Sequence, residues 1–325
     1  MSLSIIKTGV YCSVQDQGRW GHQRFGVPVS GCMDKHAASV ANILCGNAHD
    51  LAVVEFVMHG ACIRFETDQL IAFSGGGAIP VSGHRELLLH RAIFVPGNTV
   101  IDLRYKDKGC RLYMAVAGGI NTPLVMGSRS TYEPASAGKR LAIGDELPIG
   151  QWPDISQRMI GKKVPKEVTI AKWGAVELLE EMNTDCIRVL RGAEWEQFSE
   201  PSKKKWLSAC FQITQASDRM GYTLSGETLG LADRQDMVST AVSSGTVQVV
   251  PDGSPLLLMA DAQTTGGYPR IAQVIDTDIS TCAQKRPGDK IRFREVSDAV
   301  SQELYFSRIE ELKRLEKTIR VKFSI

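Results

Sequence analysis

Three segments of this chain place charged or amide side chains beside glycines, where they could bind a small ligand. The first runs from Ser13 to Gly21 and is extended by Gly31 to Asp34; it supplies an amide, two carboxylates and a guanidinium, from Gln15, Asp16, Asp34 and Arg19. Arginine binds a carboxylate through two parallel hydrogen bonds, so this loop predicts contact with a small zwitterionic or carboxylated ligand. The alternative is an Asp-Gly turn with a surface ion pair.

The second segment runs from Gln215 to Tyr222 and contains Ser217, Asp218 and Arg219. In a functional interpretation Arg219 neutralises a bound anion, and Asp218 orients that anion or handles a proton. In the structural alternative Asp218 caps its own backbone and Arg219 is solvated.

The third segment, Ala260 to Arg270, follows an apolar run that predicts a strand. Its hydroxyls and glycines favour a backbone whose N–H groups converge on an anion, as in many phosphate sites. A P-loop is excluded because the Walker lysine is missing. The structural alternative is a sharp barrel corner at the two glycines. The candidate residues of this segment are Asp261, Gln263, Thr264, Thr265, Gly266, Gly267 and Tyr268.

Other candidates for chemistry are weaker. The run Ser74 to Ala78 lacks the spacing of a dinucleotide site, and the six histidines show neither a zinc-protease nor a catalytic-triad pattern. The eight cysteines are scattered singly, which predicts reduced, mostly buried thiols and no metal site.

The charge balance argues against polyanionic partners. The chain has 38 Lys+Arg against 36 Asp+Glu, so no long-range field draws it to nucleic acid or an anionic membrane. The amino terminus has neither a signal-peptide pattern nor an apolar run long enough to cross a bilayer, and a cytoplasmic location is therefore expected.

Most of the sequence consists of short apolar or alternating runs separated by Gly, Pro, Asn and Asp, which predicts a mainly β protein with few helices. A turn containing Gly followed by Asn or Asp recurs at Pro96 to Asn98, Gly144 to Asp145 and Pro287 to Asp289. Its recurrence in both halves suggests two related barrel-like units.

The length favours two domains, because 325 residues exceed the usual size of a single core. We predict a β lobe over 1–150, with one helix at 34–46 that Asp34 caps and Gly46 ends. A linker is expected over 151–184 and a β domain over 185–296. The charged tail, 297–325, predicts an amphipathic helix.

Together these segments resemble a known family, whose members are called the C-type subunit of 5-oxoprolinase, the KipA-type antagonist of a sensor-kinase inhibitor, or allophanate hydrolase subunit 2. The second half of the urea carboxylase carboxyltransferase domain is a relative. The resemblance runs from Val14 to about Phe293. It rests on the motifs VQDQGRWGHQRFGVPVSGCMD, AVAGGI, MGSRST, TQASDRMGY, QVVPDGSPLLLMADAQTTGGYPRIA and RPGDKIRF.

The resemblance implies a cyclophilin-like β-barrel in the carboxyl-terminal half and a related β lobe in the amino-terminal half. It also implies a complex with B-type (KipI-type) and A-type partner subunits that opens 5-oxoproline to glutamate while consuming ATP. Such a reaction needs positive groups where charge develops and a carboxylate to manage protons. The family motifs assign catalysis to Asp218, Arg219 and Asp261, anion or nucleotide contact to Thr264 to Gly267, and an opposite wall to Gln15, Asp16 and Arg19.

Two other functions stay open at this point. One is a regulatory binding protein that sequesters a kinase inhibitor equivalent to the B-type partner. The other is the carboxyltransferase component of a biotin-dependent system, although no biotinyl segment is present on this chain. The chain also departs from the family pattern after MGSRST, where Tyr132 to Leu141 is shortened and altered. This loop leaves the substrate open between 5-oxoproline and urea-like or allophanate-like amides.

Overall fold

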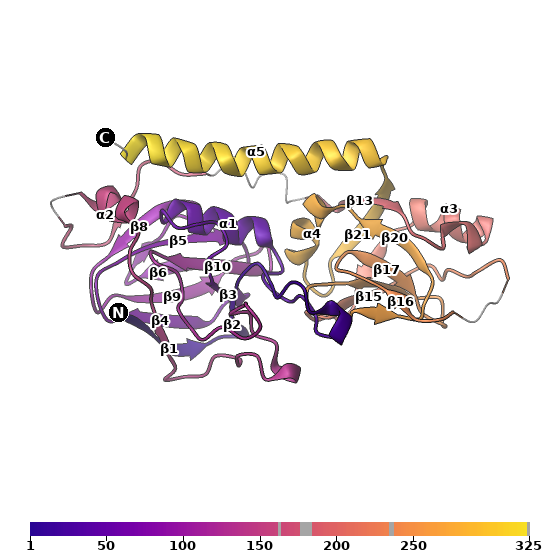
Figure 1. Ribbon diagram of the computed structural model, residues 1–325, viewed down its shortest axis with the longest axis horizontal. Helices are drawn as coiled ribbons and strands as arrows, with labels where there is room; N and C mark the ends of the chain where they lie inside the picture. The colour runs from indigo at the N-terminus through magenta and orange to yellow at the C-terminus, as the bar shows by residue number, and fades with distance from the viewer. Residues whose placement is uncertain (162–163, 176–183, 234–236, 324–325) are drawn as a thin grey trace. The chain divides into compact units, whose positions relative to one another are not determined.

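The computed structural model describes residues 1–161, 164–175, 184–233 and 237–323, and within them the chain is mainly β with a few helices (Figure 1). Two compact units can be distinguished. The first comprises Met1–Arg19, Asp34–Glu181 and Ile309–Ile325, and the second Trp20–Met33 and Met182–Arg308. The predicted fold class, two β-rich lobes of which the carboxyl-terminal one is a barrel, is confirmed.

The first unit contains two six-stranded sheets, with strand orders β11-β1-β4-β9-β6-β7 and β12-β8-β5-β10-β3-β2. Both sheets are antiparallel throughout. It is therefore not a second copy of the closed barrel that the recurring turns suggested. The strands are β1 (Ser2–Thr8), β2 (Tyr11–Gln15), β3 (Val53–Val57), β4 (Ala61–Phe65), β5 (Gln69–Gly75), β6 (Ala78–Ser82), β7 (Arg85–Glu86), β8 (Ala92–Val95), β9 (Val100–Tyr105), β10 (Arg111–Val116), β11 (Glu146–Pro148) and β12 (Thr169–Ile170).

The helix expected over 34–46 is α1 (Lys35–Leu44), which packs on β5 and β10. A carboxylate oxygen of Asp34 accepts a hydrogen bond from the Ala37 N–H at 2.9 Å, and Gly46 takes the left-handed conformation just after the helix. All six residues of β10 are buried. A strand that is buried on both faces is typically rich in apolar residues, and α1 buries one of the two faces of β10.

Of the segment predicted as a linker, 151–184, the described residues 151–161 and 164–175 belong to the first unit. They contain α2 (Asp154–Ile160), and β12 pairs with β8. Trp152, Met159, Ile160, Ala171 and Trp173 pack against buried residues of the first unit. Apolar side chains in this segment therefore dock on a sheet instead of spacing two domains, and the helical-looking stretch around 176–182 lies outside the described residues.

The second unit is built on a closed seven-stranded barrel with the order β13-β20-β17-β18-β15-β14-β21. The parallel pairing of β13 with β21 closes it, and the other pairs are antiparallel. A separate ribbon joins β16 to β19. The strands are β13 (Cys186–Arg191), β14 (Phe211–Ile213), β15 (Gly221–Ser225), β16 (Thr240–Ala241), β17 (Thr246–Val249), β18 (Pro255–Leu258), β19 (Thr265–Gly266), β20 (Arg270–Val274) and β21 (Lys290–Glu295).

The barrel core follows from alternation along its strands. In β21 Ile291 and Phe293 are buried while their neighbours face outward. The ring of Phe293 stacks on Trp206 from α3 (Glu200–Ser208), with ring centroids 3.9 Å apart. Helix α4 (Asp276–Ala283) follows β20 and packs against β13.

Residues 20–33 group with the second unit although the sequence placed them in an amino-terminal lobe. The Ser30 N–H donates to the carbonyl of Ala260 at 3.0 Å, and Met33, 1% exposed, belongs to the barrel's core. A short 3-10 helix, η1 (Gln23–Phe25), lies in this segment. The predicted boundary at residue 150 therefore leaves residues 20–33 in the wrong unit. The buried Met33 side chain and the hydrogen bond from Ser30 hold this stretch to the barrel.

The carboxyl-terminal helix is α5 (Asp298–Phe323), close to the predicted 297–325. Its residues up to Arg308 group with the second unit and those from Ile309 with the first. Only Ile319 is buried among its described residues. No helix in the described part of the chain is both long and apolar enough to span a membrane.

Candidate functional site

Asp16 and Arg19, predicted to contact substrate, instead clamp a turn within the first unit. The Asp16 carboxylate accepts hydrogen bonds from the Gly18 and Arg129 N–H groups and from the hydroxyls of Ser128 and Ser130. Arg19, 1% exposed, donates to the carbonyls of Val125 and Ser130 at 2.9 and 2.7 Å. The two family motifs VQDQGR and MGSRST are thus bound to one another, which gives these charges a structural role.

Gln15 and Asp34 are also committed to the interior of the first unit. Gln15 is fully buried and donates to the Ser13 hydroxyl at 3.0 Å. Asp34 caps α1, and its N–H donates to the hydroxyl of Tyr113 at 2.8 Å. That hydroxyl in turn donates to the buried carboxylate of Glu55 at 2.7 Å. These hydrogen bonds hold both side chains inside the first unit, where they help to fix the core.

The loop of Asp218 and Arg219 in the second unit agrees with the structural alternative for Asp218 but with neither alternative for Arg219. Asp218 accepts hydrogen bonds from the N–H groups of Met220 and Gly221 at 2.7 and 3.3 Å, so its carboxylate caps its own turn. Arg219 is not solvated: it donates to both Asp261 oxygens at 2.7 and 3.0 Å and to the Gly31 carbonyl at 2.6 Å. Its side chain is 11% exposed. Arg219 and Asp261, predicted as separate catalytic groups, are therefore partners in one bidentate ion pair.

The segment Thr264 to Tyr268 is an extended ribbon, not an anion nest. Thr265 and Gly266 form β19, which pairs with β16, and neither Gly266 nor Gly267 has the positive φ of a left-handed nest. Gly266 packs closely against Gln248, because a Cβ at position 266 would lie 2.5 Å from Nε2 of Gln248 and would have to displace that amide or the strand. Gln263 is exposed, and Tyr268 is 41% exposed.

The buried amide of Gln248 holds this ribbon to the barrel. It is fully buried, and its Nε2 donates to the Tyr268 carbonyl at 3.0 Å. Sequence reasoning did not single it out, since a glutamine inside a strand gives no signal of its own.

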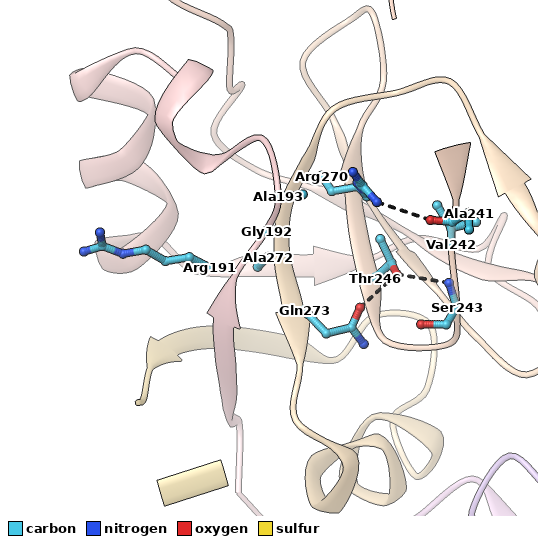
Figure 2. Close-up of a pocket in the computed structure, with 10 residues that line it drawn as sticks. All are labelled: Arg191, Gly192, Ala193, Ala241, Val242, Ser243, Thr246, Arg270, Ala272 and Gln273. Carbon is cyan, nitrogen blue, oxygen red and sulfur yellow. Dashed lines mark hydrogen bonds between the residues drawn. The ribbon is translucent and has the colours of Figure 1, made fainter. Parts of the chain in front are cut away.

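A pocket of about 280 Å³ opens on the second unit, where the end of β13, the start of β20 and the ribbon strand β16 meet (Figure 2). Neither the Asp218–Arg219 loop nor Thr264 to Gly267 lines it. Its lining residues are Arg191, Gly192, Ala193, Ala241, Val242, Ser243, Thr246, Arg270, Ala272 and Gln273.

Arg270 is the principal charged group in the pocket wall. Its Nε and one terminal nitrogen donate to the two Glu194 oxygens at 2.7 and 2.6 Å, and its other terminal nitrogen donates to the Ala241 carbonyl at 3.2 Å. These hydrogen bonds from Arg270 hold the pKa of Glu194 below its ordinary value and raise the pKa of Arg270. The guanidinium is fixed in position before any ligand arrives.

Several other polar groups of the pocket already form hydrogen bonds or ion pairs within the protein. The hydroxyl of Thr246 donates to Oε1 of Gln273 at 2.8 Å and accepts from the Ser243 N–H at 3.3 Å. Nε2 of Gln273 donates to the Ser244 carbonyl at 3.0 Å. Arg191 points away from the other lining residues in Figure 2, and it pairs with Glu295 at 2.9 Å.

The sequence contained a partial signal for this pocket. Arg270 ends the third segment, directly after Gly-Gly-Tyr-Pro. The hydroxyls and glycines of Thr264 to Gly267 led instead to the prediction that the ligand contacts this stretch. Glu194 stands 76 positions from Arg270 and had no signal, because only the closure of the barrel brings it there.

Known proteins resemble this chain along most of its length. The model of the family described as carboxyltransferase domain, subdomain A and B, matches residues 25–295. The chain belongs to this family.

Its relatives include two bacterial proteins of similar length. The C-type subunit of 5-oxoprolinase from Escherichia coli (strain K12) is 34% identical over 299 residues, which are 91% of each protein. That from Haemophilus influenzae is 33% identical over 299 residues, again 91% of each. Among solved structures, the Kluyveromyces lactis urea amidolyase matches with a TM-score of 0.84 at 25% identity, over 97% of this chain and 20% of that one. The predicted family resemblance is confirmed.

The residues predicted to hold a nucleotide do not fit ATP phosphates. Arg219 already neutralises Asp261, and the Thr264 to Gly267 backbone lacks the left-handed glycines of a phosphate nest. Within the described ranges, no group of three or more His, Cys, Asp or Glu side chains is arranged to hold a metal ion.

Proposed function

We propose that this chain is the C-type subunit of a cytoplasmic, ATP-dependent 5-oxoprolinase that acts together with B-type and A-type subunits. The observation that carries the proposal is the match to two proteins named as this subunit of 5-oxoprolinase, each aligned over 91% of its own length and 91% of this chain. A protein that aligns with its relatives over most of both lengths is a better guide to function than a fold shared with one part of a larger enzyme.

The proposed reaction gives the complex a definite chemical task. The five-membered lactam of 5-oxoproline is a resonance-stabilised amide, and phosphorylation of its carbonyl oxygen makes the ring carbon open to attack by water. Because the residues predicted to contact the ATP phosphates, Arg219 and Thr264 to Gly267, do not fit them, no phosphoryl-transfer step is assigned to these residues. What the second unit offers is a small pocket with a fixed guanidinium, which suits binding and orientation of the acid.

Reconstitution tests the proposal. The purified chain alone is expected to hydrolyse 5-oxoproline negligibly, and addition of the B-type and A-type subunits is expected to produce ATP-dependent release of glutamate. The control is the pair of partner subunits without this chain, which should be far less active than the full set. Robust turnover by this chain alone, or full turnover by the partners without it, would contradict the proposal.

The carboxyltransferase component of a biotin-dependent system is the second candidate, favoured by the TM-score of 0.84 with urea amidolyase. The two functions differ in the co-substrate consumed. A carboxyltransferase would move a carboxyl group from carboxybiotin to urea in the presence of a biotin carboxylase, with no need for 5-oxoproline. Carboxylation of urea by such a mixture, without glutamate release from 5-oxoproline, would replace the first proposal with the second.

A further inference from the structure

We propose that the pocket beside Arg270 binds a small carboxylic acid, whose carboxylate is received by the Arg270 guanidinium and the Ser243 hydroxyl. The inference rests on the proposed function for the identity of the acid, 5-oxoproline. The pocket itself is defined by the geometry of the second unit alone.

The guanidinium retains donors for a ligand. Of the five N–H groups that an arginine carries, the hydrogen bonds to Glu194 and Ala241 use three within the described part of the chain, and two are left. The bidentate pair with Glu194 fixes the plane of the group. Because its side chain is 22% exposed, it can be reached by a solute.

The remaining polar groups decide what kind of solute fits. Thr246 and Gln273 satisfy one another, while the Ser243 side chain is exposed at the pocket and has no hydrogen bond to another described residue. The groups left for a ligand are thus the Arg270 donors and one hydroxyl. A partner made of acceptors, such as a carboxylate, complements them.

The rest of the pocket fits the body of a compact acid. Ala193, Ala241, Val242 and Ala272 line it with methyl groups, and its volume of about 280 Å³ leaves room for a small ring. Gly192 allows β13 to approach β20 closely at the pocket, because a Cβ at this position would meet the carbonyl oxygen of Arg270. A five-membered lactam with one carboxylate has the required size and polarity.

Calorimetric titration of the full chain with 5-oxoproline tests the site. Binding is expected, and 2-pyrrolidinone, which has the same ring without the carboxylate, is expected to bind about ten-fold more weakly or worse, as for loss of a charge-assisted hydrogen bond. Equal binding of the two compounds, or no binding of 5-oxoproline, would overturn the inference.

Two variants locate the binding. Ser243→Phe places a ring in the pocket from an exposed position and should weaken binding of 5-oxoproline at least about ten-fold. Ser225→Phe is the matched control, since Ser225 is exposed on β15 of the same barrel and does not line the pocket. Arg270→Lys keeps a cation beside Glu194 but loses the planar fork, and it should also weaken binding. Unchanged affinity in both Ser243→Phe and Arg270→Lys would place the site elsewhere.

The two proposals fail in different ways. If the reconstituted complex turns over 5-oxoproline and Ser243→Phe leaves its KM unchanged, the pocket is not the substrate site and the proposed function stands. If the complex releases no glutamate but the chain binds 5-oxoproline in a way that Ser243→Phe abolishes, the carboxylate site stands and the proposed function fails.

Discussion

At the scale of single residues, Arg219 shows how a charged side chain in a polar loop can stabilise the fold instead of binding a ligand. Its guanidinium meets Asp261 at 2.7 Å and the Gly31 carbonyl at 2.6 Å, so it joins three separate stretches of the second unit. An exposed cleft arginine would contribute little to folding. A paired arginine that is 11% exposed contributes more, because its removal leaves a poorly solvated carboxylate.

We therefore expect Arg219→Ala to destabilise the second unit by about 2–4 kcal/mol, because Asp261 loses its ion-pair partner. Urea unfolding gives the measurement. The control is the double variant Arg219→Ala/Asp261→Ala, which removes both charges and should recover part of the lost stability. If Arg219→Ala were as stable as the parent chain, the ion pair would make no net contribution to the free energy of unfolding.

His90 is a second residue whose surroundings have a measurable consequence. Burial, assisted by the Lys106 cation, lowers the pKa of His90 from 6.5 to about 4, and the ring hydrogen-bonds the Ser74 hydroxyl at 3.2 Å. The folded state thus disfavours the proton that the unfolded chain accepts. Stability present above pH 6.5 is lost as the pH falls toward 4, by up to about 3 kcal/mol.

His90→Asn should reduce this loss, since asparagine does not titrate and tolerates the left-handed backbone at this position, where φ is 60°. Urea midpoints compared at pH 7.5, 6 and 5 give the measurement. The parent chain is expected to lose more stability than the variant between the first and last of these values. Parallel pH profiles would mean that His90 does not contribute.

At the scale of elements, the ribbon of β16 and β19 depends on one close approach. Gly266 lies against the buried amide of Gln248, whose Nε2 also holds the Tyr268 carbonyl. An added methyl group has to displace either the amide or the strand. Because Ala241 of β16 lines the pocket, a displaced ribbon changes the pocket as well.

Gly266→Ala is accordingly expected to cost about 1–3 kcal/mol, within the range of overpacking in a well-packed core. Gly230→Ala is the control: a Cβ at Gly230 meets nothing within 4 Å, and its backbone is not left-handed. Thermal unfolding of the two variants should differ clearly. Equal melting temperatures would show that the Gln248 amide moves aside without cost.

The clamp of Asp16 and Arg19 on the turn at 125–130 is the corresponding feature of the first unit. Five hydrogen bonds join the side chains of Asp16 and Arg19, which follow β2, to a turn more than a hundred residues away in the chain. Such a clamp lets a long irregular connection keep one conformation, since its buried polar groups are satisfied.

At the scale of the whole molecule, the burial of the cysteines determines which thiols can react in the folded protein. All eight are reduced thiols; six are buried, and Cys186 and Cys210 are partly exposed. Burial raises the pKa of Cys12 and Cys62 to about 11 and holds that of Cys45 and Cys282 well above the ordinary value of a thiol. The thiolate is the reactive form, so the buried thiols should be inert in the folded protein.

A thiol reagent at pH 8 should therefore label about two sites rapidly in the native chain and all eight after denaturation without reductant. Mass spectrometry of the labelled peptides identifies the two as Cys186 and Cys210. Fewer than eight labels after denaturation would reveal a disulfide, and rapid native labelling of Cys45 would contradict its burial.

The amino-acid sequence determined the local features of this protein. The strand-rich class, the helix after Asp34 and the recurring turns follow from the backbone preferences of single residues, and Gly144 and Gly288 do take a positive φ. In the turn at Pro96 the positive φ falls on Asn98 instead, a small shift within the same local chemistry.

Only the tertiary structure decided which charges are available for chemistry. Arg219 finds Asp261 42 positions away, Asp16 finds Ser128 112 positions away, and Arg270 finds Glu194 76 positions away. An arginine or aspartate has the same local signature whether it faces a ligand or a distant counter-ion. Strand register and barrel closure set that partner, so the polar loops could be recognised in the sequence but their roles could not.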